Sequence, residues 1–440
     1  MDGQTRRDFL KTAALGATVI TTASAALPIA TSAQEKVRVP MLLPPEDPKS
    51  VLMATVSTAE LERRWKLVRE VMRNDRLDYL VIRNDEAYLG GGVKWFTDFQ
   101  ATTQYAITVI FPIDDGMTFI SHGANAPAPA GPPDWAIRGI KTRLAANYFA
   151  SAGYTNTYDA ELIVKALKAK KKVVIGIVGR AFMPITIYEY LVKNLPGAKF
   201  VDATDQIDHL MAIKSPEEIE IIKSVAALQD AAMEHVKKVL QPGKRCFEIA
   251  AEAQYACLMQ GATRFVLLCN SGPKGKAVPF QPAAFQNKVI NDGDQVTILI
   301  ETNGPSGLWT ELGRVLSLGK PSQQLVDAFA TAVEAQGITL NLLKPGAGTK
   351  EVWDANNAFL VKKGFEPELR LYAHGMGYHF VERPLIRYDE TMKIKPGMNI
   401  VVHPTAANRN VWAGLTDNYI ITESGPGPCI HKTLKEIIIV

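Results

Sequence analysis

Five ionisable residues end or interrupt apolar segments in the second half of this 440-residue chain. Glu301 ends the apolar run VTILI, and Glu311 follows ten positions later in WTELGR. His374 lies in AHGMG, His403 follows MNIVV, and Asp417 opens DNYIIT. Burying several ionisable groups is costly unless they pair or bind a cation, although each alone could be an exposed strand end. Together they predict a divalent metal site, and their donors suit Zn, Mn or Fe(II).

The stretch from Leu371 to Pro384, LYAHGMGYHFVERP, surrounds one of these candidates. Gly375 and Gly377 follow the histidine closely and allow the backbone to approach a group bound by its imidazole. Glu382 lies eight residues after His374 and outside the proposed ligand set, so we predict it to be the acid–base group, with His374 as a second catalytic residue. A buried structural histidine is the alternative interpretation of this segment.

Other residues near these positions are candidates for substrate contacts. Arginines bind carboxylates well, but they are more often partners in structural ion pairs. Aromatic side chains could form apolar walls or simply belong to the core. The predicted set comprises Arg314 as a catalytic or carboxylate-binding cation, Arg383 as a second such cation, Tyr378 and His379 as pocket-lining residues, and Trp309 and Trp412 as apolar walls.

Composition indicates a soluble globular protein with more than one domain. Hydrophobic residues make up 47% of the chain and charged residues 21%, and 440 residues exceed one ordinary core. The net charge is +4, and no basic cluster is interleaved with aromatics, so nucleic acid is not an expected partner. The four cysteines form no CxxC pair and are interpreted mostly as core residues.

The first 33 residues are typical of an export signal. TRRDFLK at positions 5–11 is a twin-arginine pattern, and an apolar, alanine-rich run follows over residues 12–29. We therefore expect a Tat signal over residues 1–33, engagement of the Tat translocase and a periplasmic location. A membrane anchor is the alternative, but the run lacks sustained Leu, Ile and Val.

The remaining chain divides into an arm and two domains. Residues 34–56 are proline-rich and irregular. Strand and helix patterns alternate over residues 57–209, which predicts an α/β domain. Strands interrupted by helix pairs over residues 210–440 predict an α+β domain, a largely antiparallel sheet covered by helices. Ser215-Pro216-Glu217-Glu218 is a strong helix start near the boundary.

Residues from about 205 to 440 resemble the catalytic domain of the pita-bread family, which includes methionine aminopeptidase, aminopeptidase P, prolidase and creatinase. The resemblance rests on the order of five segments, and residues 57–200 resemble the amino-terminal domain of the prolidase and creatinase branch. The segments are HLMAIKSPEEIEIIKSVAALQDAAM, GDQVTILIETNG with WTELGRV, AHGMGYHFVERP, PGMNIVVHP and LTDNYIITESG. The resemblance implies a curved catalytic sheet and a homodimer.

The family's peptidases hold two metals with Asp, Asp, His, Glu and Glu, and this chain departs from that set. At the matching positions it has Glu301, Glu311, His374, His403 and Asp417. The two substrate histidines of the peptidases are also missing, because those regions read VPFQP and Val-Glu. The longer carboxylates would crowd a binuclear centre, so a mononuclear site fits better.

The resemblance with these departures implies an exported small-molecule hydrolase that uses one divalent metal ion, Fe, Mn or Zn, and is not a typical dinuclear peptidase. Three alternatives stay open. The ten-residue spacing is nearer to the dimethylsulfoniopropionate lyases of the superfamily, which implies a metal-dependent lyase. A metal-free hydrolase using acid–base groups would resemble creatinase. A non-catalytic binding protein would explain the missing substrate histidines.

Overall fold

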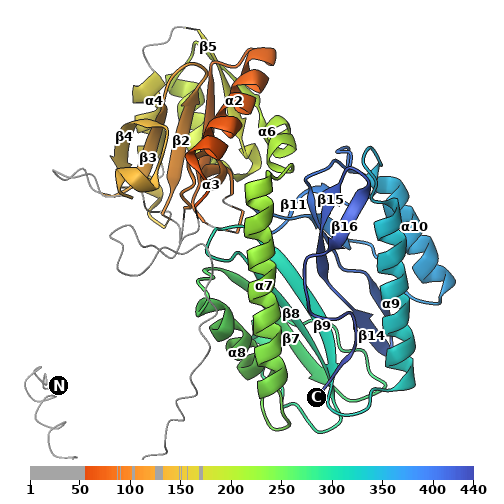
Figure 1. The fold of residues 1–440 in the computed structure, drawn as a ribbon. Helices are drawn as coiled ribbons and strands as arrows, with labels where there is room; N and C mark the ends of the chain where they lie inside the picture. The colour runs from red at the N-terminus through yellow and green to blue at the C-terminus, as the bar shows by residue number, and fades with distance from the viewer. Residues whose placement is uncertain are drawn as a thin grey trace, which may run out of the picture. The chain divides into compact units, whose positions relative to one another are not determined.

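The computed structural model describes residues 55–86, 88–89, 91–101, 105–123, 132–147, 149, 151–155, 157–167 and 172–440. These residues all belong to one compact unit, Val39–Val440 (Figure 1). The predicted Tat signal and all but the last two residues of the predicted arm lie outside the described residues. Among the described helices, none is long and apolar enough to cross a membrane.

The amino-terminal half is built on a six-stranded mixed sheet in the order β4-β3-β2-β1-β5-β6. Strand β1 pairs antiparallel with β2 and parallel with β5, and β5 pairs parallel with β6. The carboxyl ends of β1, β5 and β6 therefore meet at one edge of the sheet. The strands are β1 (Tyr79–Asn84), β2 (Ile107–Pro112), β3 (Met117–His122), β4 (Ile140–Ala146), β5 (Val173–Val178) and β6 (Ala198–Asp202).

Helices cover both faces of this sheet, as an α/β domain requires. Leu61 and Val68 of α2 pack with the face that carries Leu80 and Ile82, while α4 and α5 pack with the face that carries Val81. The helices are α2 (Thr58–Asn74), α3 (Gly91–Thr97), α4 (Tyr158–Leu167), α5 (Ile185–Asn194) and α6 (Thr204–Met211), with 3₁₀ turns η1 (Asp134–Ala136), η2 (Gly153–Thr155) and η3 (Arg180–Phe182).

Helix α7 (Pro216–Val239) begins at the predicted capping sequence. The Ser215 hydroxyl accepts the Glu218 N–H at 3.2 Å, and the Glu218 carboxylate accepts the Ser215 N–H at 2.7 Å. This reciprocal cap satisfies two donors that would otherwise lack partners and contributes about 1 kcal/mol.

The second half contains a four-stranded sheet in the order β17-β9-β8-β7, with α7 and α8 packed on one face (Figure 1). Side chains alternate between faces along a strand. Ile298 and Ile300 of β8 point into the core shared with α7 and α8, so Glu301 points to the opposite face. The elements are α8 (Cys246–Leu258), β7 (Phe265–Gly272), η4 (Ala283–Phe285), β8 (Gln295–Thr302), β9 (Thr310–Ser317) and β17 (Ile438–Ile439).

A five-stranded antiparallel sheet in the order β11-β10-β12-β15-β16 completes the carboxyl-terminal half, together with the hairpin β13–β14. An isolated bridge between Gly313 and Thr416 joins β9 to the start of β15. The elements are α9 (Gln323–Leu342), α10 (Thr349–Lys362), β10 (Ala373–Gly375), β11 (Glu382–Leu385), β12 (Asn399–Val402), β13 (Thr405–Asn408), β14 (Val411–Gly414), β15 (Asp417–Thr422) and β16 (Gly425–Cys429).

The fold-class prediction is confirmed, since an α/β region precedes an α+β region with mostly antiparallel pairing. Strand β10 begins at Ala373, one residue before His374.

Candidate metal centre

Strands β8 and β9 bring two glutamates together. Glu301 lies directly opposite Glu311 in the antiparallel register, so both side chains share the sheet face that points away from α7 and α8. Both side chains are buried, and among the described residues no hydrogen-bond donor reaches either carboxyl group. Burial raises the pKa of Glu311 to about 8, and burial together with the charge of Glu311 raises the pKa of Glu301 well above its usual value.

The two histidines come from neighbouring strands of the second sheet. His374 lies on β10 opposite Val401 of β12, and His403 directly follows β12. Their ring centroids are 5.4 Å apart. The Nδ1 of His374 bonds the Gly375 carbonyl at 2.8 Å, which requires a proton on Nδ1 and leaves the Nε2 lone pair free. Such a second bond orients histidine ligands in metal sites.

Glu311, His374 and His403 form a group whose possible ligand atoms all lie within 4.8 Å of one another. The Nε2 of His374 is 3.9 Å from a carboxyl oxygen of Glu311. Burial lowers the pKa of His374 to about 4, and burial together with the charge of His374 lowers the pKa of His403 well below its usual value. Two neutral imidazoles and a buried carboxyl without a donor fit a divalent cation.

Asp417 does not join this group, which corrects its predicted role as a ligand. Asp417 is in register with Val402, whose side chain packs in the core behind the sheet, whereas Asn418 is in register with Val401 and hence in the row of His374. Alternation therefore turns Asp417 to the opposite face. There it binds Arg314 at 2.7 Å and accepts from Gln336 of α9 at 3.2 Å.

Arg314 is likewise not available to a substrate, contrary to its predicted catalytic role. Its side chain is completely buried and donates to Asp417 and to the backbone carbonyls of Gly313, Thr416, Thr433 and Leu434. A guanidinium with this many partners holds strands together, which is the alternative that the sequence left open.

The predicted acid–base residue Glu382 lies outside the three-residue group. Lys214 contacts one of its oxygens at 2.6 Å, and the N–H groups of Tyr378 and His379 donate to the other at 2.5 and 3.1 Å. The carboxylate thus fixes the loop between β10 and β11. A Cβ atom at Gly377 would lie 2.6 Å from Cε of Lys214, so a side chain there would displace the lysine.

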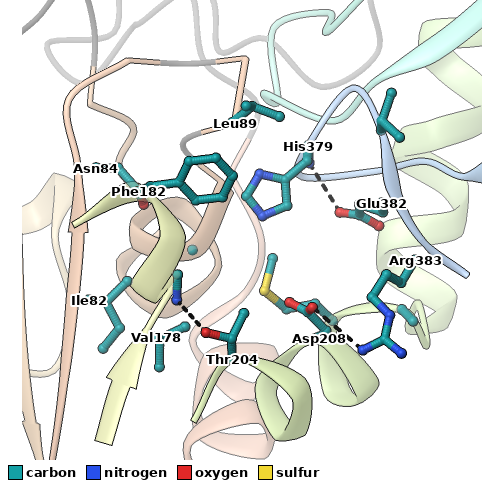
Figure 2. Close-up of a pocket in the computed structure, with 15 residues that line it drawn as sticks. Ile82, Asn84, Leu89, Val178, Phe182, Thr204, Asp208, His379, Glu382 and Arg383 are labelled. Atoms are coloured by element: carbon teal, nitrogen blue, oxygen red, sulfur yellow. Dashed lines mark hydrogen bonds and ion pairs between the residues drawn. The ribbon is translucent and has the colours of Figure 1, made fainter. Parts of the chain in front are cut away.

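The other predicted substrate residues divide between a pocket and the core. His379 and Arg383 line a cavity with Glu382 (Figure 2). The ring of His379 points into this space, but Arg383 is paired with Glu390 at 2.6 Å and with Asp205. Tyr378 is buried, and its hydroxyl accepts from Arg64 at 2.7 Å, so it holds α2 to this loop.

The two tryptophans differ. Trp309 is buried beside Val401 and Met376, which neighbour the strands that carry the histidines. The backbone N–H of Trp309 donates to the carbonyl of Gly377 at 2.7 Å. It is thus packed close to the predicted site. Trp412 instead packs edge-on against Phe280 and with the core beneath α9, so its predicted role as a pocket wall is not supported.

Sequence reasoning missed two residues. The Asn418 amide oxygen accepts the Glu311 N–H at 2.9 Å, and its nitrogen lies 3.3 Å from the side-chain oxygen of Asn399, so it ties β9 to β15 and β12. Arg370 is exposed, but its charge acts on four ionisable residues of this region. Burial is the largest cause of their shifted pKa values, and the charge of Arg370 is a further cause that lowers the pKa of Glu301, Glu311, His374 and His403. Only its position four residues before His374 could have suggested it.

Comparisons with known proteins agree with this architecture. The model for metallopeptidase family M24 matches residues 220–423, and that for the creatinase/prolidase N-terminal domain matches residues 64–213. An Xaa-Pro dipeptidase of Pyrococcus furiosus is 29% identical over 255 residues, 56% of this chain and 70% of the relative. An ectoine hydrolase of Halomonas elongata is 23% identical over 256 residues, 54% of this chain and 63% of the relative.

The solved structure of an X-Pro aminopeptidase from Thermotoga maritima superimposes with a TM-score of 0.72 at 18% identity, covering 86% of this chain and 99% of that chain. At this identity the likeness establishes the fold alone. The two family matches follow one another along the chain in the order of the two observed regions. The chain therefore belongs to the pita-bread superfamily of creatinase, prolidase and aminopeptidase P.

Proposed function

We propose that this chain is a C–N hydrolase of small molecules that uses one divalent cation held by Glu311, His374 and His403. One observation carries the proposal: the three possible ligand atoms lie within 4.8 Å of one another in a buried setting. Carboxylate with two imidazoles is a common ligand set for catalytic zinc and iron.

The side chains of β15 next to this group support a single ion. On β15 the side chain in the row of His374 is Asn418, whose oxygen already bonds Glu311, while the carboxylate of Asp417 is bound to Arg314 on the other face. The described residues thus offer one group of three ligands, not the two carboxylate-rich sets that a binuclear centre needs.

The bound cation would supply Lewis-acid polarisation of a carbonyl and lower the pKa of water. The chain's own contribution begins with His374, whose bond to Gly375 keeps its Nε2 without a proton. Glu301 carries a raised pKa and lies opposite Glu311, so it would hold a proton and deliver it to the leaving amine. Glu382 is a positioning residue in this scheme, because three donors occupy its oxygens.

The substrate class follows from the relatives and from Arg370. The relatives include an Xaa-Pro dipeptidase and an ectoine hydrolase. The charge of Arg370 reaches all four buried ionisable residues, and among the described residues no ion pair engages its guanidinium. A small amide that carries a carboxylate matches these features.

The test is an activity screen of the purified chain loaded in turn with Mn, Fe(II) and Zn. Xaa-Pro dipeptides, N-acyl amino acids and cyclic amidines are offered, and release of an amine together with a carboxylate is measured. We expect chelation to abolish activity, metal addition to restore it, and His374→Ala to lack it. Asp292→Asn, which changes an exposed aspartate outside the site, is the matched control. An unsaturated product would show elimination and contradict the proposal.

A metal-free acid–base hydrolase is the second candidate, and one observation favours it. Burial makes His374 a neutral base at pH 7 and keeps a proton on Glu311, 3.9 Å away. An acid beside a base is the arrangement that proton transfer to an amide nitrogen needs. Activity that survives exhaustive chelation but is lost in His374→Ala would establish this candidate in place of the first.

We also propose Tat-dependent export to the periplasm and assembly as a homodimer, both on the sequence and the family resemblance. Replacing the arginine pair with lysines (Arg6→Lys, Arg7→Lys) should retain the protein in the cytoplasm, as cell fractionation would show. Sedimentation of the purified chain should give twice the mass of one chain. Unchanged export or a monomer would contradict the respective proposal.

A further inference from the structure

A cavity of about 140 Å³ lies at the sheet edge where β1 and β5 end, opposite the segment that carries His379 (Figure 2). Its volume is close to that of a protein cavity that accommodates benzene, about 150 Å³. None of Glu311, His374 and His403 lines it. The cavity is therefore separate from the candidate metal group.

One wall of the cavity is apolar. Ile82 and Val178 come from the ends of β1 and β5, and Leu89, Phe182 and Met211 continue the wall. Figure 2 shows the Phe182 ring near the His379 ring. Such a wall favours the hydrocarbon body of a small ligand, whose burial removes apolar surface from water.

Most polar groups on the other wall already have partners. Glu382 is held by Lys214 and by two backbone N–H groups. The Arg383 guanidinium donates to Glu390 and Asp205. Neither residue is free to recognise a ligand without breaking these bonds.

Asp208 is different. Among the described residues its carboxyl group accepts no hydrogen bond, and its nearest cation is Arg383 at 3.9 Å. Burial raises the pKa of Asp208 to about 7, and the carboxylates of Glu382, Asp205 and Glu390 add to that rise while Arg383 opposes it. Figure 2 places this carboxyl group at the cavity. A cation entering the space would find an acceptor that lacks a donor, in a surrounding rich in carboxylates.

We propose that this cavity binds a small organic ammonium ion, with its nitrogen on Asp208 and its hydrocarbon part against Phe182 and Met211. The site does not depend on the proposed metal chemistry. An amine is also what hydrolysis of a C–N bond releases, so such a site would respond to product amines.

The test is NMR titration of the full chain at pH 8 with benzylamine and with benzyl alcohol, its uncharged counterpart. We expect benzylamine to bind at least about tenfold more tightly, the size of effect that hydrogen bonds to charged groups produce. Asp208→Asn should remove this preference, and His374→Ala and the control Asp292→Asn should keep it. Loss of metal activity with intact amine binding would thus separate this site from the proposed function.

Equal binding of both probes, no binding of either, or an unchanged preference in Asp208→Asn would overturn the proposal. Circular dichroism checks that the variants are folded. If Asp208→Asn does not fold, Phe182→Ala tests the apolar wall instead, because Phe182 is 52% exposed and is not needed for the core. It should weaken both probes, and unchanged binding of benzylamine would again overturn the proposal.

Discussion

Two sets of ionisable residues, one with Arg314 and the other with Glu311 on the opposite face of β9, differ in whether other protein groups satisfy them. Arg314 and Asp417 contact at 2.7 Å and have further protein partners. The possible ligand atoms of Glu311, His374 and His403 lie within 4.8 Å of one another, with 3.9 Å between Glu311 and His374. Arg314 and Asp417 satisfy each other and so contribute to structure. Glu311, whose carboxyl group has no donor in the described part of the chain, and the two histidines can still bind a ligand.

A shift of one residue along β15 changes which of the two sets a side chain faces. On β15, Asp417 shares a row with Val402 and Asn418 shares a row with Val401 and His374. Because neighbouring residues of a strand face opposite ways, one position decides whether a side chain of β15 faces the row of His374 or faces Arg314.

The largest effect is expected at the unsatisfied set. His403→Ala should lower hydrolysis by more than about 100-fold, because even loss of a ligand's outer partner costs 10- to 100-fold. The folded structure should persist, since His403 keeps some exposure and supports no core cluster. Steady-state kinetics on the best substrate from the screen, beside thermal unfolding, would measure both. Activity within tenfold of the unchanged chain would remove His403 from the site.

The satisfied set should instead govern stability. Asp417→Ala should lower the free energy of unfolding by roughly 3–5 kcal/mol, because it leaves the guanidinium of Arg314 buried without its anion. Urea unfolding measures this. The double variant Asp417→Leu with Arg314→Met should lose less, since no charge stays unpaired. A single-variant loss below about 1 kcal/mol would show that the pair is not structural.

The pH dependence of the metal-free protein gives an intermediate effect. A carboxyl whose pKa is raised in the folded state contributes stability that is lost as pH rises through the folded value. With the pKa of Glu311 raised from 4.5 to about 8, unfolding free energy should fall between pH 5 and pH 8, by at most about 1.4 kcal/mol per pH unit. Urea unfolding in chelator should show this fall, and Glu311→Gln should reduce it. An equal fall in the variant would contradict the assignment.

The smallest effect is expected at Arg370. Its charge opposes the rise in the pKa of Glu311 that burial causes, so Arg370→Met should move the fall in stability to higher pH. The exposed position of Arg370 implies a shift of less than about one pH unit and little change in stability at pH 6. The same unfolding series measures it. No shift would show that the guanidinium is too distant to act on the site.

Much of this arrangement can be predicted from sequence, and its failures have physical reasons. The apolar runs before Glu301 and His403 predict strand ends, and the structure brings Glu311, His374 and His403 together. Asp417 fails because the sequence does not show which face of β15 its side chain takes, and a step of one residue along a strand reverses that face.

Other features cannot be found in the sequence because they depend on segments far apart along the chain. The cavity at Asp208 combines Ile82, Phe182 and His379. The donors that occupy Glu382 come partly from Lys214, 168 positions earlier. No local sequence pattern predicts such contacts. The position of Glu382 near His374 predicts an acid–base role, and its hydrogen-bond partners instead indicate a positioning role.

Metal analysis of the purified chain tests the central claim most directly. Plasma mass spectrometry should find about one divalent ion per chain in the natural sequence and in Asp417→Asn, and almost none in His374→Ala or His403→Ala. The four proteins differ little in composition, so non-specific binding would be equal in all of them. Two ions per chain with loss of one in Asp417→Asn, or equal metal in all four proteins, would contradict a single centre built by Glu311, His374 and His403.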